Sequence, residues 1–252
     1  MTRQVSIVTA VHVPSVHYLP EAYASIVSQE MPAGWDWQWL VQEDGTTGAA
    51  EAALPDDDRI SIGAGRPLGQ GVARTYALSR ADGDLIKVLD SDDVLTPGAL
   101  AREIDVFSKN ADVGWTTCRV LDLLPDGSTA GFEGDPAGGK LERGSVLAFW
   151  RAHNYRASVH PATLCMRRNL VLALGGWMAL PAGEDTGLLL ALDAVSGGYF
   201  LSEPGLFYRK WTGQVTADPS HIEPTEWAAR NRVIDARAQT LTTMFSDGWT
   251  TA

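Results

Sequence analysis

The sequence predicts an α/β fold: a single domain with a mostly parallel central sheet flanked by helices. Residues 5–96 alternate between apolar, β-rich runs and helical segments, the pattern of strand–helix–strand crossovers. Polar clusters follow three of the strand-like runs, around His12, at Glu43 and Asp44, and at residues 90–93. Because the carboxyl ends of parallel strands share one edge of a sheet, we expect these clusters to meet in one cleft.

The first half of the chain is expected to form the parallel sheet. Runs rich in β-branched and aromatic residues predict strands at residues 5–11, 37–41, 59–62 and 85–89. Amphipathic segments, two of them opening on Pro20 and Pro97, predict helices at residues 20–29, 70–80 and 97–109. Residues 12–18 are expected to form a loop, and residues 63–71 a flexible, glycine-bearing loop.

The second half is expected to pack beside that sheet without a linker. Strands are predicted at residues 113–124, 160–166, 199–201 and 206–211, the last two separated around Pro204 and Gly205. Helices are predicted at residues 145–153, 168–174, 184–196 and 224–245. Residues 130–140 are rich in glycine and indicate a mobile loop.

Composition excludes several classes of protein. A chain of 252 residues can bury a sizeable core, and 45% hydrophobic with 20% charged residues is typical of soluble globular proteins. The net charge of -11 argues against binding nucleic acid or an anionic membrane. No run is long enough for a transmembrane segment, and a signal peptide is not evident. The two cysteines show neither disulfide-framework nor metal-site spacing, so the expected location is cytoplasmic.

The acidic cluster after residues 85–89 is the main candidate site. Asp90, Asp92 and Asp93 place three carboxylates within four residues at the end of a predicted buried strand. Such acids repel one another unless a cation lies between them, and oxygen ligands favour Mn²⁺ or Mg²⁺. The alternative is an acidic turn whose side chains cap the next helix.

Six short motifs occur in order over residues 5–216. They are Val-Ser-Ile-Val at 5–8 followed by His12, Trp-Leu-Val-Gln-Glu-Asp-Gly-Thr-Thr at 39–47, Leu-Gly-Gln-Gly-Val-Ala-Arg at 68–74, Val-Leu-Asp-Ser-Asp-Asp at 88–93, Gly-Gly-Trp at 175–177 with Gly-Glu-Asp at 183–185, and Tyr-Arg at 208–209. In this order they resemble family 2 glycosyltransferases of the GT-A (Rossmann-like) fold. The resemblance implies transfer of a sugar from a nucleotide-sugar, UDP- or dTDP-linked, with inversion and with Mn²⁺ or Mg²⁺ on the diphosphate.

The resemblance also implies roles for individual residues. The donor nucleotide would contact Ala10, Val11, His12, Asp44, Arg74, Asp90 and Ser91. The metal would be held by Asp92 with Asp90, and Asp185, next to Glu184, would be the catalytic base. The acceptor side would include Trp177, His160 and Trp211.

This chain departs from the family pattern at several of these positions. His12 stands where a stacking tyrosine is usual, Glu43 replaces one of two paired aspartates, and Thr75 stands where asparagine is common. Trp211 stands where many members carry a histidine that can approach the metal.

The resemblance divides the single domain into three parts. Residues 1–110 would form the nucleotide-sugar-binding half, residues 111–222 the acceptor-binding half, and residues 223–252 a C-terminal helix and tail. The acceptor would offer a hydroxyl or amine and could be a saccharide, a lipid-linked sugar, a peptide or a natural product.

Three other functions remain open from the residues. Asp90 and Asp92 imitate the Asp-x-Asp of aspartate-nucleophile phosphatases, but those enzymes need a further acid where residues 188–190 are leucine. A nucleotidyltransferase would want a glycine-rich basic signature after the first strand, and residues 12–18 lack one. A catalytically degenerate nucleotide-sugar-binding module is the third alternative.

Overall fold

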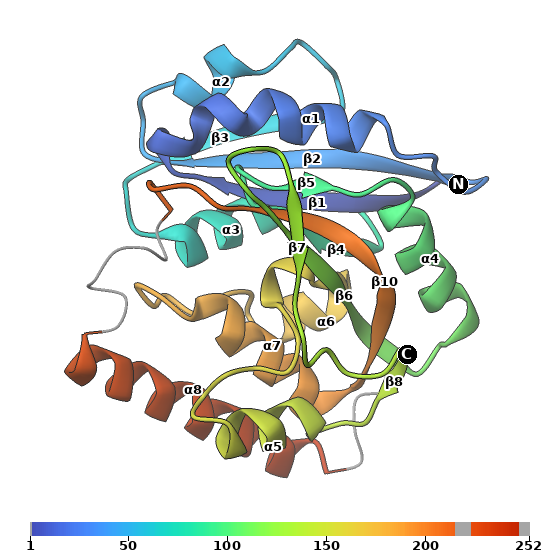
Figure 1. Cartoon of the computed structure of the whole chain (residues 1–252), viewed down its shortest axis with the longest axis vertical. Coiled ribbons are helices and arrows are strands. Elements are labelled where there is room, and N and C mark those ends of the chain that lie inside the picture. The colour runs from blue at the N-terminus through green and yellow to red at the C-terminus, as the bar shows by residue number, and fades with distance from the viewer. Residues whose placement is uncertain (1, 215–222, 247–252) are drawn as a thin grey trace.

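A single ten-stranded sheet runs through both halves of the molecule (Figure 1). The computed structural model describes residues 2–214 and 223–246. The strands are β1 (Arg3–Val11), β2 (Trp35–Asp44), β3 (Ile60–Gly65), β4 (Leu85–Val88), β5 (Val94–Leu95), β6 (Val113–Leu123), β7 (Thr129–Gly131), β8 (Gly139–Leu141), β9 (Cys165–Arg167) and β10 (Gly197–Arg209). Their order is β3-β2-β1-β4-β9-β6-β10-β5, with β7 paired to β6 and β8 to β10.

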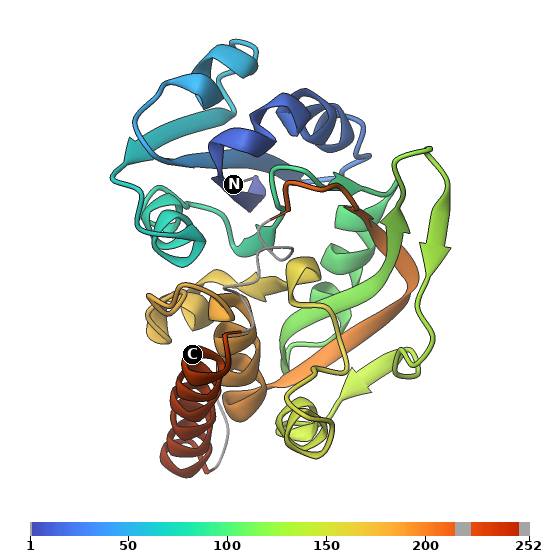
Figure 2. The ribbon, with the colours of Figure 1, turned by 60° about the vertical axis from the view of Figure 1, so that its left-hand side comes forward.

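Helices cover both faces of this sheet. They are α1 (Leu19–Val27), α2 (Ala49–Ala53), α3 (Gln70–Leu78), α4 (Ala99–Lys109), α5 (Ser145–Ala152), α6 (Arg168–Ala173), α7 (Glu184–Val195) and α8 (Pro224–Met244), with 3₁₀ helices η1 (Val13–Tyr18) and η2 (Pro161–Thr163). Residues of α1, α2 and α4 share one buried cluster, and residues of α3 and α5 to α8 share the other. Figure 2 shows α8 lying along α7 at the outside of the second layer.

Alternation along the strands produces these two layers. Side chains of successive strand residues point to opposite faces. In β1, Ile7 packs in the cluster beneath α1 whereas Val8 packs in the other, and in β2 Trp39 and Leu40 divide in the same way. Strands β1, β2 and β4 are buried over most of their length on both faces, as expected for a parallel sheet between two helical layers, whereas the edge strand β3 is partly exposed.

The parallel pairing aligns the carboxyl ends of the first strands. β1 pairs in parallel with β2 and with β4, and β2 pairs in parallel with β3. The register places Val11 opposite Glu43 and Val8 opposite Val88. The polar segments that follow these strands therefore emerge at the same edge. The α/β class, the flanking helices and the parallel pairing expected from the sequence are confirmed.

The second half extends this sheet, so the expectation that it packs beside the sheet was wrong. The three-residue strand β9 is antiparallel to β4 on one side and to β6 on the other, and it joins the two halves. Pro161 begins η2 immediately before it, because proline has the backbone angle of a helical first turn, so the strand predicted at residues 160–166 shrinks to β9. The domain boundaries predicted at residues 110 and 222 stay predictions, the second falling in the undescribed segment 215–222 and the tail in 247–252.

Strand β10 is continuous where two strands were expected. The pairing of β10 with β6 shifts register on either side of Pro204, and this irregularity accommodates the missing N–H of proline without ending the strand. Glycine is needed next to it, because a Cβ at Gly205 would collide with the side chain of Cys118. The carbonyls of Pro204 and Gly205 accept hydrogen bonds from Thr96, which follows β5.

Two elements near the carboxyl ends of the strands were missed. Residues 12–18, expected to be a loop, contain η1, in which Ser15 N–H and Oγ both donate to the carbonyl of His12 (2.9 and 2.7 Å). Helix α2 follows β2 and is too short for a periodic signal. Glu43 accepts hydrogen bonds from the backbone N–H groups of Thr47 (2.5 Å) and Ala50 (3.2 Å), which holds the turn that leads into α2. Burial of the Glu43 carboxylate acts to raise its pKa, but the N–H donors outweigh this effect and lower the pKa of Glu43.

The segments expected to be loops are partly strand. Residues 63–65 belong to β3, and the ends of the segment 130–140 pair as β7 with β6 and as β8 with β10. Glycine-rich composition identified these segments as irregular but could not indicate the strands that lie beside them, because that pairing is set by residues distant in sequence.

We expect Asp193 to make stability depend on pH. Asp193 is fully buried on α7 and accepts a hydrogen bond from Leu147 N–H at the start of α5 (2.9 Å). Burial raises its pKa from 3.8 to about 6, against the effect of the α5 N–H donors. The folded state therefore binds this proton more tightly than the unfolded chain. The resulting stabilisation is complete below pH ~4 and lost as pH rises through about 6. Asp193→Asn should remove this pH dependence, which amounts to roughly 3 kcal/mol.

Urea unfolding between pH 4 and 7.5 checks the prediction. Relative to the wild type, Asp193→Asn should gain stability as pH rises, whereas Asp82→Asn, at an exposed position, should follow the wild-type curve. Parallel pH profiles for the wild type and Asp193→Asn would contradict it.

Candidate active site

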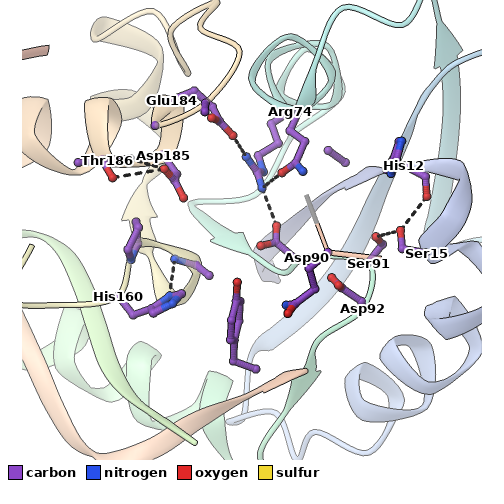
Figure 3. A pocket seen from close by; sticks show the side chains of 18 of the residues that line it. His12, Ser15, Arg74, Asp90, Ser91, Asp92, His160, Glu184, Asp185 and Thr186 are labelled. Carbon is purple, nitrogen blue, oxygen red and sulfur yellow. Dashed lines mark hydrogen bonds and ion pairs between the residues drawn. The ribbon is translucent and has the colours of Figure 1, made fainter. Parts of the chain in front are cut away.

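A cavity of about 270 Å³ lies where β1 and β4 end and α7 begins (Figure 3). Its lining comes from both halves of the chain. Of the residues predicted from the sequence, those that line it are Ala10, His12, Arg74, Asp90, Ser91, Asp92, His160, Glu184, Asp185 and Trp211. His12, Ser91 and Asp92 lie on one side, and His160, Glu184 and Asp185 on the other. The cleft expected at the strand ends is therefore present for the clusters around His12 and at residues 90–93, whereas Glu43 and Asp44 do not line it.

Arg74 joins the two sides of this cavity. It is almost fully buried on α3, and it donates to Asp90 Oδ1 (2.6 Å), to Glu184 Oε1 (2.7 Å) and to Gln70 Oε1 (2.9 Å). Burial by itself would favour the neutral guanidine, but the carboxylates of Asp90, Glu184 and Asp185 raise the pKa of Arg74. Arg74 therefore remains charged and holds the end of β4 against the start of α7.

Asp92 is held by Trp211, which stands where the family pattern has histidine. The indole Nε1 of Trp211 donates to Asp92 Oδ2 (2.7 Å), and Arg209 Nε donates to the backbone carbonyl of Asp92 (2.8 Å). The ring of Trp211 meets His17 and Tyr18 edge-on, at centroid distances of 5.8 and 5.4 Å. Burial, with Asp90 nearby, raises the pKa of Asp92, while the indole hydrogen bond opposes the shift.

The third acid of the cluster, Asp93, binds a backbone N–H group. It is buried, its Oδ1 accepts from Arg209 N–H (2.9 Å), and it lies outside the cavity. Burial, together with the neighbouring charges of Asp90 and Asp92, raises the pKa of Asp93 well above its ordinary value. Asp93 therefore ties β10 to the end of β4 rather than capping α4.

Asp185 sits in the first turn of α7. Its Oδ1 accepts from the N–H of Thr186 (2.6 Å), which fixes the carboxylate at the positive end of the helix. Glu184, the other predicted catalytic residue, is more buried and is engaged by Arg74. Burial and the adjacent Asp185 raise the pKa of Glu184, and Arg74 opposes the shift. The geometry therefore leaves Asp185 as the carboxylate on this wall that faces the cavity without an ion pair among the described residues.

His160 reaches the cavity from the segment before η2. Its Nδ1 accepts from Ala162 N–H (3.4 Å), so the neutral ring carries its proton on Nε2. Burial lowers the pKa of His160, against the effect of Asp185 and Asp90, which favours that neutral form. The ring lies 4.8 Å from the ring of Tyr208.

A buried ion pair anchors the η2 turn. Lys87 Nζ donates to Glu103 Oε1 (2.5 Å) and to the carbonyl of Thr163 (2.7 Å). Both charged side chains are fully enclosed between β4 and α4. From the sequence, Lys87 is one residue of an apolar predicted strand. Its hydrogen bond to Thr163 in η2 joins residues 76 positions apart, so no local pattern indicates it.

Three predicted site residues lie outside the cavity. Val11 is fully buried in the layer beneath α1, so its side chain does not line the cavity, and its predicted role at the nucleotide stays a prediction. Trp177 is only 5% exposed and packs in the opposite core layer, outside the cavity lining, and its predicted acceptor-side role stays a prediction. Asp44 lies at the same sheet edge, but its carboxylate accepts from the N–H groups of Leu68 (2.7 Å) and Gly69 (3.1 Å). It thereby shapes the loop that leads into α3.

The cavity also includes residues that the sequence did not single out. Ser15 Oγ lies 2.6 Å from Ser91 Oγ, and this hydrogen bond joins η1 to the acidic cluster. Gln70, Tyr208 and Gln214 also line the cavity. Gln70 and Tyr208 belong to two of the six motifs, so their place in the site could have been predicted from those motifs. Ser15 and Gln214 lie in segments without a motif.

The carboxylate oxygens at this cavity are suitable ligands for a small divalent cation that also binds phosphate groups. Asp90 and Asp92 present two carboxylates on one wall, and each accepts one hydrogen bond from a side chain. Within the described residues, no cluster of three or more His, Cys, Asp or Glu side chains could hold a metal ion alone. Mg²⁺ and Mn²⁺ often take one or two carboxylates and complete their coordination with phosphate oxygens and water.

Part of the chain is similar to a known protein family. Residues 6–123 match the profile of Glycosyl transferase family 2. This segment includes His12, Arg74, Asp90 and Asp92 and ends before Asp185. No curated protein sequence matches the chain. None of the helices within residues 2–214 and 223–246 combines the length with the hydropathy of a membrane-spanning segment.

Among solved structures the fold resembles S. aureus TarS. The 1–349 fragment of TarS in complex with UDP-GlcNAc aligns with a TM-score of 0.71 and 14% identity, covering 96% of this chain and 71% of that one. The same fragment in complex with UDP gives a TM-score of 0.66 at 14% identity, with coverages of 96% and 70%. Against a longer TarS chain the TM-score is 0.66, and this chain spans 42% of its length.

The TarS likeness, at 14% identity, concerns the fold, and it confirms the GT-A architecture expected from the motifs. The profile match concerns the sequence, and it covers four of the six motifs, those of the sheet edge and α3. It disfavours the phosphatase and nucleotidyltransferase alternatives, which rested on the acidic cluster or on the sheet alone. The match of residues 6–123 to glycosyl transferase family 2, together with the GT-A fold, thus identifies the chain as a glycosyltransferase.

Proposed function

We propose that this chain transfers a sugar from a UDP-sugar to an acceptor hydroxyl with inversion at the anomeric carbon. The observation that carries the proposal is one cavity with Asp90 and Asp92 on one wall and Asp185 on the other. TarS, which shares the fold, has been solved with UDP and with UDP-GlcNAc, and this supports the choice of donor.

The sheet edge would bind the nucleotide. Ala10 and His12 end β1 and line the cavity, and the exposed imidazole of His12 offers a flat ring and a hydrogen-bonding nitrogen. Ser91, joined to Ser15, lies between the two metal-site acids. Arg74 would act on the donor through Asp90, because its Nη1 and Nη2 groups already donate to Asp90, Glu184 and Gln70 and its Nε is buried.

The departing diphosphate gains negative charge, which the site has to stabilise. Breaking the sugar–phosphate bond places negative charge on the departing diphosphate, in a cavity whose walls carry several acids. Asp92 and Asp90 would hold Mn²⁺ or Mg²⁺, which when bound neutralises that charge. The indole of Trp211 positions the Asp92 carboxylate for this task.

The opposite wall would accept the proton. As the acceptor oxygen forms its bond to the anomeric carbon, the bond to the diphosphate breaks on the other side. The acceptor hydroxyl passes its proton to the Asp185 carboxylate, and the products are the inverted glycoside and UDP. The N–H of Thr186 fixes Asp185 for this role, and a general base in such a position typically contributes ~10²–10⁴-fold.

Isothermal titration with UDP tests the proposal at its donor side. We expect UDP to bind more tightly with Mn²⁺ present than with EDTA. In Asp92→Asn that enhancement should fall at least ~10-fold, because the amide loses the charge that attracts the cation. The charge-matched variant Asp82→Asn, exposed on the turn before β4, should behave as the wild type. Equal UDP affinities with and without metal in the wild type would refute the metal assignment, and absence of UDP binding would refute the donor.

A further inference from the structure

A second cavity, of about 520 Å³, adjoins the first. The two share His160, Pro161 and Thr186 in their linings. Thr186 follows Asp185 at the start of α7, so the proposed base stands at the boundary between the cavities. A molecule in the second cavity would reach the reacting centre past Asp185 and His160.

The outer wall of this cavity offers aromatic surface. Phe132, from the segment after β7, is 44% exposed. Phe149 and His153, one helical turn apart on and just after α5, have stacked rings at a centroid distance of 3.6 Å and an interplanar angle of 7°. The carbonyl of Phe149 lies 2.8 Å from His153 Nδ1, which locks that stack. Exposed aromatic faces that line a cavity can stack on the apolar face of a ligand ring.

The charges around the aromatic surface are mixed. Asp135 is paired with Arg119 (3.0 Å), while Glu133 and Arg156 line the cavity from exposed positions. Carboxylates accept hydrogen bonds, and a guanidinium donates several in a fixed fork. With acids and a base on the same lining, the cavity matches a neutral ligand with many hydroxyls better than an anionic chain, which Glu133 would repel.

We propose that this second cavity binds a neutral saccharide as the acceptor. The inference rests on the proposed transferase function, and it selects one class from the acceptors that the sequence left open. A sugar ring would stack on Phe132 or on the Phe149–His153 pair, and its hydroxyls would bond to Glu133 and Arg156. The hydroxyl nearest Thr186 would attack the anomeric carbon, lose its proton to Asp185 and release UDP.

Protein-observed NMR tests the ligand class. Cellobiose and chitotriose serve as neutral saccharide probes, glucose 6-phosphate as an anionic probe and a Gly-Ser peptide as a non-saccharide. We expect the two saccharides to shift amide signals of residues 132–135 and 153–160. Phe132→Ala should weaken their binding roughly three- to tenfold, the range for one aromatic contact. Leu172→Ala, which removes an equally exposed side chain from α6, should leave their binding unchanged.

UDP titration of the same samples separates the two hypotheses. Phe132→Ala should retain wild-type UDP affinity, because Phe132 lies outside the donor cavity. If UDP binds but neither saccharide shifts these signals, or if only glucose 6-phosphate or the peptide does, the saccharide assignment is overturned while the donor assignment stands. If UDP fails to bind, the proposed function fails, and saccharide shifts weakened by Phe132→Ala would still identify the ligand class of the cavity.

Discussion

Asp185→Asn is expected to lower glycosyl transfer by roughly 10²–10⁴-fold while UDP affinity stays within about twofold of the wild type. The physical reason is that Asp185 lies on the wall opposite Asp90 and Asp92, where the proposed reaction releases the acceptor proton. Asparagine keeps the oxygen that accepts the Thr186 N–H hydrogen bond, so the start of α7 should remain intact. Release of UDP from UDP-sugars in the presence of saccharide acceptors, with parallel UDP titration, measures both quantities.

Two matched variants sharpen the test of Asp185. Asp82→Asn makes the same change of charge at an exposed turn and should keep full activity. Glu184→Gln changes the neighbouring acid, which is committed to Arg74, and should act mainly on stability. If UDP affinity in Asp185→Asn falls as steeply as the transfer rate, Asp185 is a binding residue and the assignment as base fails.

Arg74→Met is expected to destabilise the fold by about 3–5 kcal/mol, because it leaves a buried carboxylate without its counter-charge. Arg74 is 2% exposed, and its partner Glu184 is 9% exposed, so water cannot replace the lost hydrogen bonds. Asp90, at 24% exposure, is better able to recruit water. Urea unfolding at pH 7.5 gives the free energy of unfolding directly.

The double variant Arg74→Met with Glu184→Gln serves as the control for this effect. Neutralising the stranded carboxylate should recover a large part of the lost stability, so the two changes should be strongly non-additive. Arg74→Lys should retain more stability than Arg74→Met because it keeps a charge, although it cannot reach three acceptors at once. Unchanged stability in Arg74→Met with lost UDP affinity would show that Arg74 instead binds the nucleotide directly.

The placement of the site was largely predictable, because it depends on local pattern. Asp90 and Asp92 follow a short apolar strand, His12 follows another, and parallel pairing brings both strand ends to one edge. Asp185 was predictable for a different reason. It opens a leucine-rich helix after a glycine, and the six motifs preserve their order along the chain.

The use of individual side chains was less predictable. Asp44 and Asp90 both follow strands at the same edge, yet Asp44 bonds to the loop at residues 68–69 whereas Asp90 faces the cavity. Trp177 and Trp211 are both tryptophans at motif positions, and one is core while the other holds Asp92. The residue type permits either outcome, and the neighbours that decide it lie far away in sequence.

The α/β class, the edge at which the acids gather and the likeness to glycosyl transferase family 2 could be predicted from the residues, because they depend on strand and helix periodicity and on short motifs. The folded structure was needed to show that β9 joins the two halves into one sheet and that Arg74 links Asp90 to Glu184. It alone placed a second cavity against Asp185. These features depend on contacts between residues distant in sequence, such as Arg74 with Glu184, 110 positions apart, and Ile86 of β4 with Met166 of β9, 80 positions apart, which no local pattern specifies.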